Sequence, residues 1–304
     1  MTQAVLPIRA AIGFALLLLQ VMSAEAQAPR IFHAETNLVV LHATVKNTHG
    51  ELVTDLGQEA FTVYDNGKRQ KIEMFRREDI PVSLGLLIDN SGSMRALRAK
   101  VEAAALACVR ASHPQDEVFV LNFGDKPQLD VPLTSDVRRL EAGITRVDSI
   151  GGTAMRDAID VGSRYLSSSA TKERKVLLVI TDGKDNASLA SLDAIRKQAQ
   201  QREITVYAIG LFNQDDQAGA GGARDELNEL TDSTGGAAHY PSSLEDIDAV
   251  ALAIAREIRN QYTIAFNRTG RLDGSYRKLR VDVRGQGRLV VRARAGYWAT
   301  PALP

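Results

Sequence analysis

The sequence predicts an α/β fold: a doubly wound, mainly parallel sheet with helices on both faces, inserted in a small β-sandwich built from the N- and C-terminal flanks. Two patterns predict it. Between residues 81 and 261, short apolar runs alternate with segments of helical spacing, which is typical of a parallel sheet. On either side of that region, polar and apolar residues alternate, as they do in strands with one exposed face.

The composition indicates an ordinary globular protein. Its 304 residues include 37 basic and 37 acidic side chains, so the formal charge is balanced and gives no indication of a nucleic-acid partner. The single cysteine, Cys108, continues the apolar spacing of a predicted helix, so we expect a buried, unreactive thiol. Four histidines are expected on the solvated surface: His33, His42, His49 and His113.

Residues 1–26 have the layout of a secretory signal peptide. Arg9 precedes an apolar run from Ala10 to Leu19, and small residues lead to an Ala24-Glu25-Ala26 cleavage signal. The apolar run is too short to span a bilayer comfortably, so no membrane span is expected after cleavage. We therefore expect a mature protein that begins near Gln27 and is secreted or periplasmic in a bacterial cell envelope.

The two flanks, residues 27–80 and 262–304, are predicted to be β-rich. In the first, Asn66-Gly67 lies between two strand-like runs, which is a strong hairpin signal. Each flank is too short to form a stable sheet alone, so we expect them to pair with each other. Five aromatic side chains are expected in the shared core: Tyr64, Phe75, Tyr262, Phe266 and Trp298.

The central region, residues 81–261, is predicted to contain four strands and six helices. The strands are expected at 82–89, 116–123, 174–183 and 204–211. The helices are expected at 95–111, 133–147, 155–166, 191–203, 223–236 and 244–261. Thr134 or Ser135 is the expected cap of the second helix.

Three polar loops follow elements of this sheet. Asp89, Ser91 and Ser93 come after one strand, Asp182 after another, and Thr153 directly before a helix. In an open α/β sheet, ligands bind beyond the carboxyl ends of the strands, so these side chains are expected to meet. Oxygen donors without His or Cys suit Mg²⁺, or Ca²⁺ and Mn²⁺. The alternative is that the hydroxyls are ordinary helix caps.

The motif order D-x-S-G-S, G-G-T and T-D-G resembles the von Willebrand factor type A (VWFA) domain, whose fold is of this Rossmann-like kind. The resemblance implies a metal-ion-dependent adhesion site formed by Asp89, Ser91, Ser93, Thr153 and Asp182. It also implies a protein-binding role in adhesion or scaffolding, in which a partner supplies an acidic side chain to the metal. The flanking phrases "VTDLGQEAFTVYDNGKRQKI" and "VRARAGYW" are similar to exported bacterial VWFA-related proteins.

A long glycine-rich loop, residues 212–226, is expected at the same edge of the sheet, with Asn213, Asp215 and Asp216 forming a rim for the partner. The alternative is a disordered surface loop without a partner. The alternative function is a Mg²⁺-dependent hydrolase acting on phosphates or esters, with Asp157, Asp185 or a loop acid as general base. The sequence lacks a G-x-S-x-G nucleophile motif. A binding module without catalytic residues is therefore the favoured interpretation.

Overall fold

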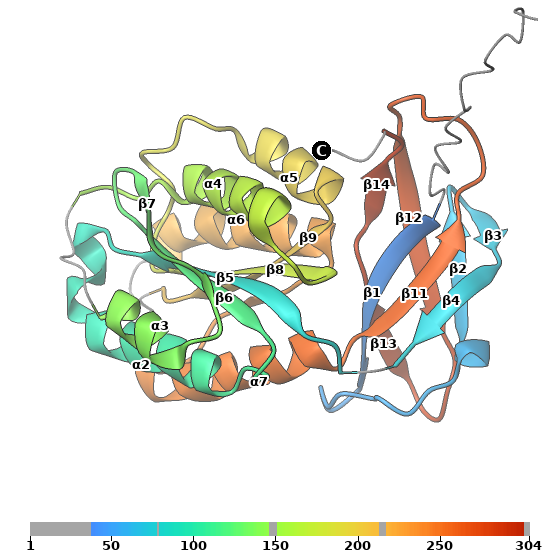
Figure 1. Ribbon diagram of the computed structural model, residues 1–304, viewed down its shortest axis with the longest axis horizontal. Coiled ribbons are helices and arrows are strands. Elements are labelled where there is room, and N and C mark those ends of the chain that lie inside the picture. Colours follow the sequence, from blue (N-terminus) through green and yellow to red (C-terminus); the bar gives the residue numbers. More distant parts are fainter. Residues whose placement is uncertain (1–37, 78, 146–150, 213–216, 301–304) are drawn as a thin grey trace, which may run out of the picture. The chain divides into compact units, whose positions relative to one another are not determined.

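The computed structural model describes residues 38–77, 79–145, 151–212 and 217–300. A six-stranded sheet lies at the centre of the α/β region (Figure 1). Its strands are β5 (Val82–Asp89), β6 (Glu117–Phe123), β7 (Pro127–Thr134), β8 (Arg174–Thr181), β9 (Ile204–Gly210) and β10 (Ala238–His239). They lie in the order β10-β9-β8-β5-β6-β7, and only β7 pairs antiparallel to its neighbour. The predicted mainly parallel sheet is confirmed.

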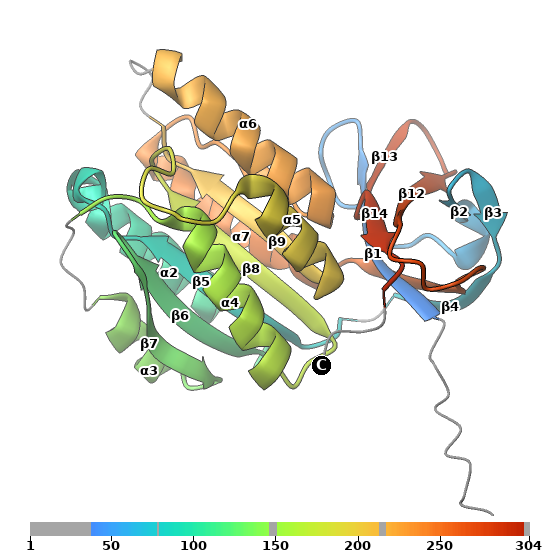
Figure 2. The same ribbon diagram turned by 90° about the horizontal axis from the view of Figure 1, so that it is seen from above.

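Helices cover both faces of this sheet, as predicted (Figure 2). One face packs against α2 (Arg98–Arg110), α3 (Val137–Ile144) and α7 (Ile247–Arg259). The other face packs against α4 (Met155–Ser169), α5 (Leu192–Gln201) and α6 (Gln217–Thr234). No helix of the described residues is long and apolar enough to cross a membrane.

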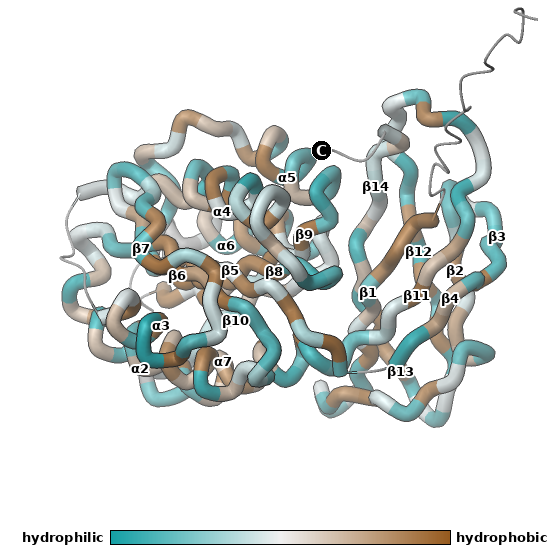
Figure 3. Tube along the Cα trace, in the orientation of Figure 1, coloured by the Kyte–Doolittle hydropathy of each residue, from teal (hydrophilic) through white to brown (hydrophobic). Residues whose placement is uncertain are grey.

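The central strand β5 is buried along its whole length. Its Leu84 and Leu86 pack on the face of α2 and α7, whereas Leu87 packs on the face of α4 and α5. Figure 3 shows hydrophobic residues running through β5, β6 and β8. Burial on both faces explains the continuous apolar run of the sequence.

Cys108 is also buried, and burial raises the pKa of its thiol to about 12, as expected for an inert cysteine.

The antiparallel edge strand β7 was not predicted from the sequence. Three residues separate it from the end of β6 and it precedes α3, so the predicted helix at 133–147 is wrong at its start. The cap is Asp136, whose side chain accepts hydrogen bonds from the backbone N–H groups of Arg138 and Arg139. Thr134 instead accepts a hydrogen bond from the N–H of Asp136.

The flanks form two four-stranded sheets. Their strands are β1 (Leu38–Asn47), β2 (Phe61–Asp65), β3 (Lys68–Gln70), β4 (Ile72–Arg76), β11 (Tyr262–Asn267), β12 (Tyr276–Val283), β13 (Leu289–Arg292) and β14 (Gly296–Trp298). One sheet has the order β13-β1-β11-β4 and the other β14-β12-β2-β3. Both sheets contribute to a single hydrophobic cluster that includes Leu41, Val63, Ile264 and Leu279. Strands from the two ends of the described chain thus pair directly.

Three of the expected core aromatics join this cluster: Tyr262 and Phe266 are buried, and Phe75 packs against it. The expectation is wrong for Tyr64, which lies on the outer face of β2 beneath the guanidinium of Arg280. It is also wrong for Trp298, which donates a hydrogen bond to Gln200 of α5.

Buried polar contacts join the flanking sheets to the α/β region. Arg174, which is completely buried, donates hydrogen bonds to the carbonyl of Ile258 and to the hydroxyl of Thr263. Glu257 of α7 pairs with Lys46 at 2.7 Å and with Arg292. Charges buried in this way must be paired, because unpaired ones are costly.

A polypeptide of residues 27–80 is predicted not to fold by itself. Within the described part of this segment, β1 pairs along its length with β11 and β13, and β2 pairs with β12, so most strand partners come from the C-terminal flank. Its amide NMR spectrum should therefore be poorly dispersed, and adding residues 262–304 should disperse it. A dispersed spectrum from residues 27–80 alone would contradict this expectation.

Candidate metal site

Parallel pairing places two carboxylates at one edge of the sheet. β5 and β8 are neighbours, Asp89 is the last residue of β5, and Asp182 follows the last residue of β8. The hydroxyl of Thr181 donates a hydrogen bond of 2.6 Å to Asp89 Oδ2, which joins the two strand ends. The N–H of Ser91 donates to Asp89 Oδ1 at 2.9 Å.

The two serine hydroxyls lie beside these acids. Ser93 Oγ donates a hydrogen bond of 2.9 Å to Asp182 Oδ1. Ser91 Oγ and Ser93 Oγ are 3.1 Å apart. The structure thus brings together Asp89, Ser91, Ser93 and Asp182, as the sequence analysis expected.

These hydroxyls do not act as helix caps. Ser91 precedes the short 3₁₀ helix η2 (Gly92–Ala96), but its side chain makes no capping hydrogen bond. The N-cap residue of α2 is Leu97, and that of α4 is Ala154, the residue after Thr153; neither cap makes a side-chain hydrogen bond. The capping alternative therefore does not explain why Ser91, Ser93 and Thr153 are present.

The Gly151-Gly152-Thr153 loop lies against both other loops. The N–H of Gly92 donates to the carbonyl of Gly151 at 3.1 Å. Thr153 is 3% exposed, and its Oγ1 lies 4.0 Å from the position that a Cβ of Gly183 would occupy. The hydroxyl of Thr153 therefore faces the residues that follow Asp182, which places it with the other four candidates.

The electrostatics of the site fit a bound cation. Burial raises the pKa of Asp89, although hydrogen bonds from Thr181 and Ser91 oppose the rise. Burial and the neighbouring charge of Asp89 raise the pKa of Asp182 to about 6. Among the described residues, no Lys, Arg or His forms an ion pair with either carboxylate. A divalent cation would supply the missing positive charge.

Other acids near this edge hold the loops in place, a role that the sequence analysis missed. Asp185 accepts hydrogen bonds from Arg156 and Ser188. Burial acts to raise the pKa of Asp185, but these hydrogen bonds outweigh it and hold the pKa below its usual value. Asp157 accepts hydrogen bonds from the N–H groups of Leu189 and Ala190. Both described candidates for a general base are therefore engaged in loop structure.

The remaining predicted residues are Asn213, Asp215 and Asp216, which lie outside the described residues. The loop predicted at residues 212–226 is too long, because α6 already begins at Gln217. In the described chain, no three His, Cys, Asp or Glu side chains gather in a way that could hold a metal ion.

Comparisons with known proteins agree with the motif order. Residues 84–184 match the model of the von Willebrand factor type A domain. The fold is similar to that of a von Willebrand factor type A protein from Catenulispora acidiphila, with a TM-score of 0.52 and 12% identity over 88% of this chain and 75% of that chain. It is also similar to proximal thread matrix protein 1 of the mussel byssus, with a TM-score of 0.50 and 16% identity over 64% of this chain and 51% of that chain.

A third similar structure is an aerotolerance-related membrane protein from Bacteroides fragilis, with a TM-score of 0.47 and 20% identity over 58% of this chain and 98% of that chain. No curated protein matches the chain in sequence. The region that carries the motifs, residues 84–184, therefore matches the VWFA family, as the motifs indicated.

Gly151→Ala is predicted to lower the free energy of unfolding by more than the positive φ at residue 151 alone would cost. Gly151 has a φ of +82°, and a Cβ there would lie 2.4 Å from Asp125 Oδ2. Gly50 is the matched control, because its φ is +80° and a Cβ there would meet no atom within 4 Å. Alanine at either position should cost about 1–2 kcal/mol for the backbone. A Cβ at residue 151 would also displace the carboxylate of Asp125, and losing its hydrogen bond from the N–H of Gly152 should add about 1 kcal/mol.

Urea denaturation followed by circular dichroism measures both free energies of unfolding. An equal loss in the two variants would show that Asp125 does not restrict this loop.

Proposed function

We propose that this protein is an exported binding module that holds a divalent cation and uses it to dock an acidic side chain of a partner protein. Asp89, Ser91 and Ser93 hold the ion, and Thr153 and Asp182 contact it directly or through water. Mg²⁺ is the proposed ion, with Ca²⁺ or Mn²⁺ as alternatives, because every donor is an oxygen. The cation would provide positive charge that orients an anionic partner group.

One observation carries the proposal: two carboxylates and three hydroxyls converge where neither helix capping nor ion pairing accounts for them. Asp89 is 0% exposed, so its charge is costly unless a cation compensates it. The Ser93–Asp182 hydrogen bond places a hydroxyl and a carboxylate oxygen 2.9 Å apart, close enough to serve as neighbouring ligands of one ion.

The loop after Asp182 offers a contact for the same partner. Leu189 is 98% exposed, yet its N–H is held by Asp157 and the preceding Ser188 by Asp185. A single exposed leucine is common on protein surfaces, so its exposure alone is no evidence of a contact. From its place on the loop after Asp182, we infer that Leu189 packs on an apolar residue of the partner.

A hydrolase is the less favoured function. Metal-assisted hydrolysis needs a general base near the ion. In the part of the chain that the structure describes, Asp185 and Asp157 are both committed to hydrogen bonds with the loop that they hold. We therefore propose binding rather than turnover.

The proposed organisation of the chain follows the sequence boundaries. Residues 1–26, which lie outside the described residues, are the proposed signal peptide. Residues 81–261 form the VWFA domain, and residues 27–80 and 262–304 together form a β-sandwich. The proposed location is the periplasm or the extracellular space of a bacterium.

Asp89→Asn is predicted to abolish Mg²⁺ binding while the protein stays folded. Asparagine keeps the size of the side chain and an acceptor for Ser91, but it removes the charge that binds the ion. A ligand at 100 times its Kd stabilises the folded state by about 2.7 kcal/mol. Mg²⁺ should therefore raise the unfolding temperature of the unaltered protein and leave that of the variant unchanged.

Asp282→Asn is the matched control, since Asp282 pairs with Arg280 on an exposed face of β12. It should keep the full response to Mg²⁺. Calorimetry that finds the same Mg²⁺ affinity in Asp89→Asn as in the unaltered protein would refute the proposed site.

Partner capture from envelope extract should require both the ion and Leu189. EDTA and Asp89→Asn should each release the captured protein, whereas Leu189→Ser should weaken capture at least tenfold with Mg²⁺ affinity unchanged. Capture that withstands EDTA would contradict the metal-dependent docking.

The mass of the protein recovered from the envelope tests export, because cleavage after Ala26 leaves Gln27 as the first residue.

A further inference from the structure

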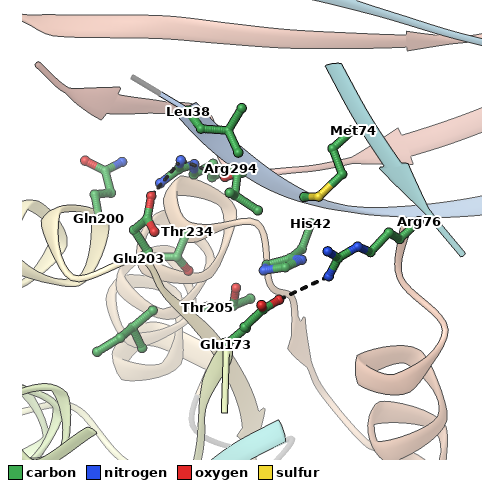
Figure 4. A pocket seen from close by; sticks show the side chains of 12 residues that line it. Leu38, His42, Met74, Arg76, Glu173, Gln200, Glu203, Thr205, Thr234 and Arg294 are labelled. Carbon is green, nitrogen blue, oxygen red and sulfur yellow. Dashed lines mark hydrogen bonds and ion pairs between the residues drawn. The ribbon is translucent and has the colours of Figure 1, made fainter. Parts of the chain in front are cut away.

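A cavity lies far from the candidate metal site. Its volume is ≈ 420 Å³, and it opens between the sheet β13-β1-β11-β4 and the residues at the beginning of β8 and β9 (Figure 4). The metal candidates follow the ends of β5 and β8, whereas Glu173 precedes β8 and Glu203 precedes β9. The cavity is therefore at the opposite edge of the parallel sheet.

One wall of this cavity is largely apolar. Leu38, Val40 and His42 alternate along β1 and face the cavity, while the residues between them are buried in the flank cluster. Met74 of β4 and Ile204 of β9 also line it. This wall can cover the apolar body of a small molecule.

The other wall contains a buried guanidinium with an unused donor. The side chain of Arg294 is 9% exposed, and its Nη2 donates to the carbonyl of Val40 at 2.7 Å and to Glu203 at 3.1 Å. Its Nε is buried and has no hydrogen-bond partner among the described residues. Leaving such a donor unsatisfied costs about 1–3 kcal/mol.

The charges around the cavity favour an anion inside it. Glu203 and Glu173, the acids that pair with Arg294 and Arg76, are 59% and 74% exposed, so water screens them at the rim. Burial, followed by the charges of Arg174 and Arg294, lowers the pKa of His42 to about 3. His42 is therefore neutral, and the positive charge within the cavity comes from Arg294.

We propose that this cavity binds a small organic carboxylate with an apolar body. The carboxylate pairs with the guanidinium of Arg294, and the apolar part lies against Val40 and Met74. The volume is within the range of about 300–1,000 Å³ found for ligand sites, and such sites are common where two structural units meet. This site is independent of the metal and of the proposed function.

The protein contains its own reporter for the cavity. Trp298 is the single tryptophan of the sequence, and its Nε1 donates to Gln200, a lining residue, at 3.2 Å. Binding should therefore change the fluorescence of Trp298. We chose decanoate as the probe, with decanol as a neutral molecule of similar length and acetate as an anion without the apolar body.

Decanoate should bind saturably in both fluorescence and calorimetric titrations, at least tenfold more tightly than decanol, and acetate should not saturate. Arg294→Gln should weaken decanoate binding at least tenfold. Arg280→Gln is the matched control, because it removes an exposed arginine of β12 and should leave the affinity unchanged. Val40→Phe fills the cavity and should also weaken binding.

The proposal is overturned if the unaltered protein shows no saturable binding, or if decanol binds as tightly as decanoate. It is also overturned if Arg294→Gln remains folded by circular dichroism and keeps its affinity. If that variant does not fold, Val40→Phe decides: a folded Val40→Phe variant with unchanged decanoate affinity places the binding elsewhere and overturns the proposal.

Discussion

The carboxylate of Asp89 is the constraint on which the site depends. It ends the central strand β5, which is buried along its length, so the side chain cannot retreat into solvent. Its hydrogen bonds come from neutral donors, the N–H of Ser91 and the hydroxyl of Thr181. Neutral donors offset only part of the cost of burying a charge, and Asp182 adds a second negative group nearby. A cation between the loops would offset the buried charge of Asp89 and the repulsion between Asp89 and Asp182.

Other acids at this edge accept hydrogen bonds that hold the loops together. Asp185 accepts from Arg156 and Ser188, and Asp125 accepts from the N–H of Gly152 at 2.6 Å. These carboxylates stabilise the loops that present Thr153 and Asp182. Composition alone does not separate these acids, which position the loops, from Asp89 and Asp182, which are the proposed ligands.

The sequence predicted the elements and ligand candidates that repeat a regular pattern. The apolar run of β5 and the short oxygen side chains after it were sufficient to place Asp89, Ser91 and Ser93, because strand ends of a parallel sheet share one edge. β7 was missed because an exposed edge strand needs few apolar residues, and of its eight residues only Val131 is buried. His42, expected in solvent, lines a cavity beside β1 and the beginning of β9 instead, because β1 has packed structure on both faces. Long-range packing of that kind leaves no local signal in the sequence.

A crystal structure of the protein grown with Mn²⁺, measured for anomalous scattering, tests the central claim most directly. We predict an anomalous peak within about 2.0–2.6 Å of the hydroxyl oxygens of Ser91 and Ser93. The ion should also replace the direct hydrogen bond between Ser93 and Asp182 seen here. No peak between these residues at saturating Mn²⁺, with that hydrogen bond intact, would contradict the account.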